Sequence, residues 1–342
     1  MRKTLVVPLL LILICGCRPP RQAEPTRRPS PVLWQTASPR SPSATWPAPT
    51  RGQPPTASPT SQMTPNPQPT ATPTPLPVAA NDLNLLLLGS DQRIGREETW
   101  RTDSLIVVAI RPRTGLVAML SVPRDLWVDI PGHGPDRINV ADYLGETSQG
   151  PGGGPALVAA TLKENLGIPI DASARIHYQG LARIIDALGG INVTSDRAYD
   201  EWFWDETAPD GVSHMVVVTG TQRMDGRLAL QYARARHGTS DFDRSRRQQQ
   251  ILLALRDAAM RPEVLPRLPA LLMALSDTVE TDLKPGQILS LLGLALRLKP
   301  EAFRGRVFDS TMVRDWVTPG GAQVLLPNRA RIEQVWRELT SP

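Results

Sequence analysis

The chain has 342 residues, a net charge of +5 and a pI of about 9.6, and its length allows one large folded domain or two small ones. The charge is unevenly placed, because residues 1–80 contain eight basic residues and one acidic residue, which leaves 30 basic and 32 acidic residues for residues 81–342. A mildly acidic folded region argues against general nucleic-acid binding, which requires a basic domain. Both cysteines, Cys15 and Cys17, lie near the N-terminus, so the rest of the chain has no disulfide framework.

The first 17 residues are predicted to be an export signal. A basic start is followed by an apolar run at 4–14, which is shorter than the roughly 20 residues that a membrane-spanning helix needs. The run ends in Cys15-Gly16-Cys17, where a small residue precedes a cysteine, and this resembles a bacterial lipoprotein signal. Cys17 would then be the acylated mature N-terminus, and the protein would lie on the outer face of the cytoplasmic membrane, in the cell envelope. An ordinary signal peptide or an uncleaved anchor is the alternative.

Residues 18–80 are predicted to form a disordered tether. The segment is rich in Pro, Ser and Thr and contains 18 of the chain's 35 prolines. Such a composition buries too little apolar surface to offset the entropy lost on ordering. A fully extended polyproline II segment of this length would reach on the order of 190 Å, which is an upper limit.

The region from residue 81 to 342 mixes strands and helices. Short apolar runs predict buried strands at 83–88, 104–110, 116–122 and 191–193, and weaker patterns predict strands at 216–218 and 306–309. Helical patterns occur at 155–166, 180–188, 247–260, 265–275, 287–298 and 328–339. Because no internal repeat is present, the sequence predicts a single α/β domain with a sheet between helices.

An arginine-rich stretch at 231–250 is the most informative part of the sequence. If residues 230–236 are extended, Arg234 and Arg236 point to the same face, because a strand has a period of two residues. After a turn at Gly238, Asp241 would cap a helix that begins at about residue 242.

On this predicted helix, Arg244 and Gln248 lie one turn apart on a face that continues with Ile251, Leu252 and Leu255. Desolvating an arginine on an apolar face costs on the order of several kcal/mol unless an anion binds it. The stretch therefore predicts an anion pocket, whereas Arg246 and Arg247 are interpreted as solvent-exposed.

Two aspartates are candidate metal ligands. Asp91 and Asp103 lie in loops beside successive predicted strands, so neighbouring strands would place both carboxylates at one end of the sheet. Mg²⁺ prefers one or two carboxylates together with water and substrate phosphates. The alternative is that Asp91 caps a turn and Asp103 pairs with Arg101.

Arg101 and Arg124 also lie at predicted strand ends. Together with Arg234, Arg236 and Arg244 they supply five guanidinium groups, whose planar shape suits phosphate oxygens. Five cations beside a metal indicate a pyrophosphate.

Residues 199–205 concentrate Trp202, Phe203 and Trp204 in an acidic loop, which would be either a lid that meets lipid or sugar or a loop packed on the domain.

Taken together, these stretches resemble the LytR-CpsA-Psr family of cell-envelope glycopolymer transferases. The matching segments occur in the family's order and are LLLLGSD (85–91), RTDSLIVV (101–108), LSVPRDLWVDIPGHGPDRIN (120–139), GLARIIDALGGINV (180–193), MDGRLALQYARAR (224–236) and DFDRSRRQQQIL (241–252). The resemblance implies a three-layer α/β/α sandwich at 81–342 with a central mixed sheet. It also implies transfer of a glycopolymer from a polyprenyl-pyrophosphate carrier to a peptidoglycan hydroxyl, with Mg²⁺-assisted departure of the lipid pyrophosphate.

The same resemblance assigns roles to individual residues. Asp91 and Asp103 would hold Mg²⁺ (or Mn²⁺), and Asp241 would act as a base or an orienting carboxylate. The pyrophosphate would be surrounded by Arg101, Arg124, Arg234, Arg236, Arg244 and Gln248, of which Arg101 and Arg124 are also catalytic candidates. Leucines after Gln248 would line an apolar tunnel for the prenyl chain, or form ordinary core. The alternative functions are a polyprenyl-pyrophosphate hydrolase, a transcriptional attenuator, and an envelope-anchored protein that binds wall polymers without turnover.

Overall fold

The structure is a computed structural model that describes residues 82–91, 100–204, 210–235, 240–295 and 297–341. The predicted signal sequence at 1–17 and the predicted tether at 18–80 lie outside the described residues, as does Arg236. Among the residues that the structure describes, no helix has the length and apolar character needed to cross a bilayer.

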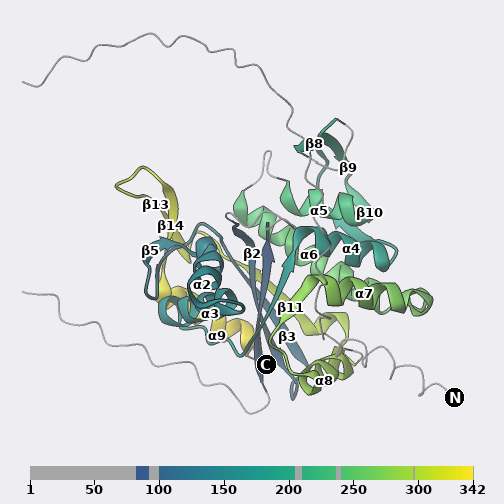
Figure 1. Ribbon diagram of the computed structural model, residues 1–342, viewed down its shortest axis with the longest axis horizontal. Coiled ribbons are helices and arrows are strands. Elements are labelled where there is room, and N and C mark those ends of the chain that lie inside the picture. The colour runs from purple at the N-terminus through teal and green to yellow at the C-terminus, as the bar shows by residue number, and fades with distance from the viewer. Residues whose placement is uncertain (1–81, 92–99, 205–209, 236–239, 296, 342) are drawn as a thin grey trace, which may run out of the picture. The chain divides into compact units, whose positions relative to one another are not determined.

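A mixed six-stranded sheet lies at the centre of the folded region (Figure 1), with the strand order β11-β6-β1-β2-β3-β12. β1 pairs parallel with β6 and antiparallel with β2, β2 pairs antiparallel with β3, and β3 pairs parallel with β12. The strands are β1 (Leu83–Ser90), β2 (Thr102–Arg111), β3 (Leu116–Val122), β6 (Ala172–His177), β11 (Val279–Thr281) and β12 (Phe303–Val307).

Both faces of this sheet are covered by helices. Because side chains alternate along each strand, each strand contributes residues to the cores on both faces. In β1, Leu86 and Leu88 pack into one core, while Leu85 and Leu87 pack into another. The first core is closed by α2 (Ala141–Gln149), α3 (Gly153–Leu166) and α9 (Arg329–Thr340). The opposite side carries α4 (Tyr178–Ala187), α5 (Gly226–Arg234), α6 (Asp241–Ala259), α7 (Leu268–Thr278) and α8 (Pro285–Ala295). The predicted three-layer α/β/α sandwich is confirmed.

Four short two-stranded sheets and three 3₁₀ helices complete the described fold. The paired strands are β4 (Trp127–Ile130) with β5 (Gly134–Arg137), β7 (Ile191–Ser195) with β10 (Gly220–Met224), β8 (Tyr199–Trp204) with β9 (Val212–Val217), and β13 (Val313–Val317) with β14 (Gln323–Pro327). The 3₁₀ helices are η1 (Ile138–Val140), η2 (Pro262–Arg267) and η3 (Pro300–Ala302). The strand predicted at 216–218 is the end of β9, and the one predicted at 306–309 begins earlier, as β12.

The arginine-rich stretch folds differently from the prediction at two points. Its first part is the end of helix α5 rather than an extended segment, so Arg234 is the last residue of a helix. Asp225 caps this helix by accepting a hydrogen bond from Leu228 N at 2.8 Å. The following helix, α6, begins at Asp241 and is capped by Ser240 rather than by Asp241. Ser240 and Asp243 form a reciprocal capping box, which fixes this start.

Candidate functional site

The predicted site residues are brought to one end of the central sheet by its topology. β1 and β6 run parallel and β3 runs antiparallel to β2, so β1, β3 and β6 end where β2 begins. Asp91 follows β1, Arg124 follows β3, and Tyr178 follows β6. The pairing of β1 with β2 shifts at this end, since Gly89 is opposite Ser104 but Ser90 is opposite Thr102. Asp103 is the extra residue of this bulge, a feature that redirects a side chain.

Asp103 is held by two side chains that follow other strands, Arg124 after β3 and Tyr178 after β6. Its Oδ1 accepts a hydrogen bond from Arg124 Nη1 at 2.6 Å, and its carboxylate is also hydrogen-bonded to the Tyr178 hydroxyl. Burial alone would raise the pKa of Asp103, but Arg124, Tyr178 and Arg244 together lower it below its ordinary value. Burial likewise opposes the charge of Arg124, but Asp103 and neighbouring carboxylates raise its pKa. Asp103 therefore pairs with Arg124, and not with Arg101 as the alternative interpretation expected.

Asp91 lies next to this pair. Its Oδ1 accepts a hydrogen bond from Arg101 N at 2.5 Å, and its own N–H donates to Arg101 O at 3.0 Å. The protein around the carboxylate desolvates it and raises the pKa of Asp91, and the negative charge of Asp103 adds to this increase. The Arg101 guanidinium donates to Trp100 O at 3.1 Å and is exposed.

Two helices supply the remaining cations. Arg234, at the end of α5, places its guanidinium 5.4 Å from the centre of the Tyr178 ring. Arg244, in the first turn of α6, is 4% exposed, and its Nη2 contacts Asp241 Oδ2 at 2.8 Å. The charge of Asp241 also raises the pKa of Arg124. Asp241 therefore interacts with both Arg124 and Arg244.

Of the predicted site residues, Asp103, Arg234, Arg244 and Gln248 line a polar cavity of about 260 Å³, whereas Asp91, Arg101, Arg124 and Asp241 do not line it. Its lining is mostly polar and comes from the start of β2, the junction of β6 with α4, β8, α5 and α6. The lining residues are Asp103, Tyr178, Glu201, Trp202, Phe203, Ala233, Arg234, Arg244 and Gln248.

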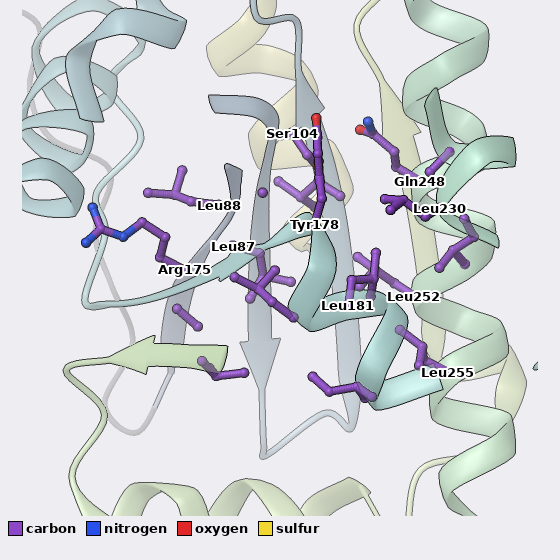
Figure 2. A pocket seen from close by; sticks show the side chains of 18 of the residues that line it. Leu87, Leu88, Ser104, Arg175, Tyr178, Leu181, Leu230, Gln248, Leu252 and Leu255 are labelled. Atoms are coloured by element: carbon purple, nitrogen blue, oxygen red, sulfur yellow. The ribbon is translucent and has the colours of Figure 1, made fainter. Parts of the chain in front are cut away.

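A second cavity of about 400 Å³ adjoins the first and is almost entirely apolar. The two share Tyr178, Ala233, Arg234 and Gln248. In Figure 2, Tyr178 and Gln248 lie at one end of the apolar cavity, and Leu255 lies at the other end. Leu252 and Leu255 of α6 line the cavity, which is one of the two alternatives for the leucines after Gln248, and strands β1 and β6 with helices α4, α5 and α7 supply most of the rest.

The interpretation of Arg247 as a solvent-exposed residue is wrong. Its side chain is 3% exposed; it donates to Tyr232 O and to the Tyr199 hydroxyl at 2.9 and 3.1 Å, and it also contacts Ala235 O. Arg247 therefore joins α5, α6 and β8 inside the protein. Arg246 is exposed, as predicted.

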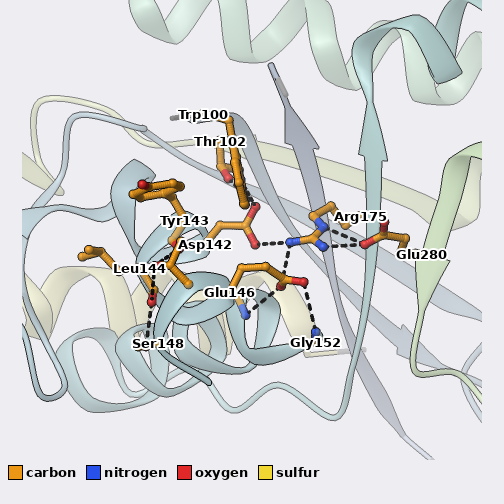
Figure 3. Close-up of polar contacts among 12 residues, drawn as sticks. Trp100, Thr102, Asp142, Tyr143, Leu144, Glu146, Ser148, Gly152, Arg175 and Glu280 are labelled. Atoms are coloured by element: carbon orange, nitrogen blue, oxygen red, sulfur yellow. Dashed lines mark hydrogen bonds and ion pairs between the residues drawn. The ribbon is translucent and has the colours of Figure 1, made fainter. Parts of the chain in front are cut away.

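A buried ion-pair cluster holds Trp100 and Thr102, the described residues on either side of Arg101 (Figure 3). Asp142 of α2 is fully buried and accepts hydrogen bonds from Trp100 Nε1 at 3.2 Å and Thr102 Oγ1 at 3.1 Å. Its other oxygen accepts from Arg175 Nη1 at 2.9 Å. Arg175 also pairs with Glu146 and Glu280, which links α2 to β6 and β11. Because Trp100 and Thr102 flank Arg101, Asp142 positions this part of the site without lining either cavity.

Sequence reasoning missed Tyr178, which contacts Asp103 and lines both cavities. Burial raises the pKa of Tyr178 well above its ordinary value, and the charge of Asp103 adds to this, so the hydroxyl stays protonated and donates. Its position follows from β6, which was not predicted. A strand at 172–177 would have been the signal, because it ends at the same end of the sheet as β1.

The residues at this end of the sheet fit a divalent cation. Asp91 and Asp103 are close enough for the charge of one to raise the pKa of the other, which is a repulsion that a cation would relieve. No cluster of three or more His, Cys, Asp or Glu side chains that could hold a metal occurs in the described part of the chain. Two carboxylates without nitrogen or sulfur ligands suit Mg²⁺, which completes its shell with water and phosphate oxygens.

Comparison with known proteins assigns the chain to a family. A model described as the LytR_cpsA_psr family matches residues 56–341, which is most of the chain. The chain belongs to the LytR_cpsA_psr family. This confirms the resemblance found in the sequence.

Several named members of the LytR_cpsA_psr family are similar to the chain. TagU of Oceanobacillus iheyensis, named a polyisoprenyl-teichoic acid–peptidoglycan teichoic acid transferase, is 32% identical over 212 residues, covering 61% of this chain and 62% of that protein. TagT of Bacillus subtilis, with the same description, is 27% identical over 265 residues, or 76% of each chain. LcpB of Corynebacterium glutamicum, named a probable cell wall biosynthesis protein, is 34% identical over 196 residues, or 53% of this chain and 43% of that protein. The chain thus matches less than two thirds of the length of TagU and LcpB.

Solved structures of the LytR_cpsA_psr family have the same fold. The crystal structure of B. subtilis TagV has a TM-score of 0.60 and 25% identity, covering 78% of this chain and all of TagV. The structure described as TagT bound to LIIa-WTA has a TM-score of 0.58 and 24% identity, covering 76% of this chain and 90% of that one.

Proposed function

We propose that this protein transfers a glycopolymer from a polyprenyl-pyrophosphate carrier to a hydroxyl group of peptidoglycan. The proposal rests on two adjoining cavities with shared wall residues, one polar with arginines in its wall and one apolar. A lipid diphosphate has the same two parts in the same order. The names of TagU and TagT support a glycan donor and a peptidoglycan acceptor.

The apolar cavity would hold the part of the prenyl chain next to the diphosphate. Burying hydrocarbon stabilises the complex by roughly 25 cal/mol for each Å² removed from water. The side chains shared by the two cavities would then lie at the junction of lipid and phosphate. Gln248 would donate a hydrogen bond there, Arg234 would supply a positive charge, and Tyr178, whose hydroxyl is bonded to Asp103, would form part of the wall.

The diphosphate would lie in the polar cavity, against Arg234 and Arg244. Both belong to helices, and the pairing of Arg244 with Asp241 fixes the guanidinium before substrate binds. Asp241 therefore suits the orienting role better than that of a base. Arg124, held by Asp103, would contribute a third positive charge. Such preorganised cations stabilise the charge that develops on a departing phosphate. The predicted contribution of Arg236 stays a prediction.

The predicted Mg²⁺ (or Mn²⁺) would be held by Asp91 and Asp103. When bound, the ion would withdraw negative charge from the diphosphate oxygens. Arg101 would act next to Asp91, through the backbone hydrogen bonds that hold that carboxylate.

We place the bond cleavage within the diphosphate, because the cations gather there. The acceptor oxygen forms a bond to the phosphorus that carries the glycan, and the bond from this phosphorus to the bridging oxygen breaks. The acceptor loses its proton, and the lipid leaves as its phosphate. Departure of the lipid pyrophosphate, by attack on the sugar carbon instead, would yield a lipid diphosphate, and mass spectrometry of the lipid product distinguishes the two.

This function also requires a particular location. We propose that acylated Cys17 anchors the protein to the outer face of the cytoplasmic membrane and that residues 18–80 tether the catalytic domain at 81–342. Metabolic labelling with a fatty acid, compared between the natural chain and Cys17→Ala, tests the anchor.

The test of the activity compares two arginines of α6. Arg244→Ala should lower the rate of glycan transfer roughly a hundredfold to a thousandfold, which is the usual effect of removing one group that stabilises developing charge. Arg246→Ala is the matched control, because Arg246 is 60% exposed and lines neither cavity. Thermal unfolding of both variants shows whether they stay folded. Equal transfer rates for the natural chain and folded Arg244→Ala would overturn the proposed site.

A hydrolase is the main competing function, because water can replace the acceptor hydroxyl. The lipid phosphate released by the natural chain is measured with and without peptidoglycan. A transferase releases it in step with glycan attachment, whereas release that is independent of the acceptor indicates a hydrolase. Absence of any release with a polyprenyl-diphosphate glycan would favour a non-enzymatic polymer-binding protein or attenuator.

A further inference from the structure

The β8–β9 hairpin carries a fixed, exposed tryptophan at the polar cavity. Trp202 lines this cavity and is nevertheless 65% exposed. It is paired across the hairpin with His214, and the two rings are stacked with their centres 4.4 Å apart and an angle of 10° between their planes. His214 is in turn held by Asp200, since Nε2 and Oδ1 are 2.5 Å apart. An indole in this arrangement is oriented before any ligand arrives.

The position of the hairpin relative to the two cavities indicates what it meets. The residues shared by the cavities come from α4, α5 and α6, so the apolar cavity leaves the polar one on that side. The β8 residues, Glu201, Trp202 and Phe203, line only the polar cavity. If the proposed function holds, a lipid diphosphate enters the apolar cavity with its tail. Its glycan must then leave the polar cavity past another part of the wall, and β8 forms such a part.

The chemistry of the hairpin suits a sugar ring. One face of a pyranose presents C–H groups, which pack on an aromatic ring, while its rim carries hydroxyls. The Asp200 carboxylate is 75% exposed and lies beside the indole and imidazole stack, where it can accept hydrogen bonds from hydroxyls. A bilayer is a poorer match for the same surface, even though Val216 on this face is 52% exposed. Moving the Asp200 carboxylate and its histidine partner into hydrocarbon would be costly.

We infer that Trp202, supported by His214 and Asp200, is the platform on which the first sugar of the glycan donor stacks. This inference rests on the proposed function and names the part of the donor that the hairpin selects. The platform is a binding element for the saccharide, and the diphosphate is held by other residues.

The test measures binding of two probes to the full-length protein by isothermal titration. The probes are the terminal methyl ester of farnesyl diphosphate and farnesyl-diphospho-N-acetylglucosamine, which carry the same charge and differ only in the group on the terminal phosphate. We expect the natural chain to bind the sugar-bearing probe about tenfold more tightly, which is the size of effect that aromatic stacking supplies. Trp202→Ala should abolish this preference and leave the affinity for the methyl ester unchanged. Trp202→Phe should retain a preference, because it keeps an aromatic face.

Control variants and a second assay separate the inference from its competitors. Val216→Ala, on the same exposed face, should bind both probes like the natural chain. A preference that survives in Trp202→Ala, or an equal loss of affinity for both probes, would overturn the platform. Weaker binding of Trp202→Ala to vesicles of anionic phospholipid, with the sugar preference intact, would make the hairpin a membrane contact instead. If the natural chain binds neither probe, the proposed function itself fails and the platform fails with it, whereas equal binding of both probes refutes the platform alone.

Discussion

Replacing Asp142 by asparagine tests whether the buried cluster behind the site positions it. One oxygen of Asp142 accepts hydrogen bonds from Trp100 and Thr102, and the other accepts from Arg175. Asparagine has nearly the same shape but offers only one oxygen. In either orientation its NH₂ group would therefore face a donor. The variant loses a charge and leaves at least one buried donor without an acceptor.

The expected cost follows from these contacts. Removing one partner of a buried ion pair costs about 3–5 kcal/mol, and Arg175 keeps two carboxylates, Glu146 and Glu280, so we expect about 3 kcal/mol. In a folded region of this size that corresponds to a decrease in the melting temperature of about 6–12 °C. Urea denaturation should show a lower midpoint with an unchanged slope. The transfer rate should also fall about tenfold or more at a temperature where the variant is folded, because Arg101 and Asp103 lose their fixed position.

The matched control is Glu280→Gln. The Glu280 side chain is 58% exposed, and pairs that reach solvent contribute at most about 1 kcal/mol. If Asp142→Asn unfolds within about 0.5 kcal/mol of the natural chain, which is the range of neutral surface changes, the cluster does not contribute as we reason. Full stability together with a lost transfer rate would instead show that Asp142 acts in the site directly.

Three further predictions concern the cavities, the metal and pH. Leu181→Trp narrows the apolar cavity and should weaken the binding of long prenyl diphosphates in titration calorimetry, while the affinity for inorganic diphosphate stays the same. If the variant and the natural chain bind prenyl diphosphates with equal affinity, the cavity does not bind lipid. Asp91→Asn should raise the Mg²⁺ concentration required for half-maximal transfer about tenfold, and an unchanged requirement would exclude Asp91 as a ligand. Hydrogen bonding to His177 and pairing with Arg175 lower the pKa of Glu280 to about 2 from 4.5. This group therefore stabilises the fold above pH 4.5, and its contribution of about 1 kcal/mol after solvent screening is lost as the pH falls towards about 2. Urea denaturation at several pH values should show that the free energy of unfolding of Glu280→Gln lacks this pH-dependent contribution.

The central strands were predictable because their signal is local. β1, β2 and β3 are continuous apolar runs, and both of their faces are buried. β6 was not predictable in this way, since ASARIH has few strong strand formers. It is a strand because its backbone pairs with β1 on one side and β11 on the other, which no pattern within six residues reveals.

The same distinction applies to the site. The approach of Asp91, Asp103 and Arg124 was predictable, because antiparallel neighbours follow one another in the chain and their ends meet. The prediction of an extended segment at 230–236 is wrong, because the signal for a helix there is the cap at Asp225, which lies upstream of that segment. The prediction that Arg247 is solvent-exposed is wrong for a different reason. Helix α6 contacts protein on several sides, so its buried surface is wider than one stripe of apolar residues.

The two outermost strands of the central sheet have a consequence for self-association. β11 has three residues and β12 has five, and both carry charged side chains, including Glu280, Arg304 and Arg306. An unpaired strand can recruit the strand of another copy, and short, charged strands are the usual safeguard against this. We therefore expect copies of this domain to remain separate even when many of them are crowded together, so that any lasting oligomer would have to use a different surface.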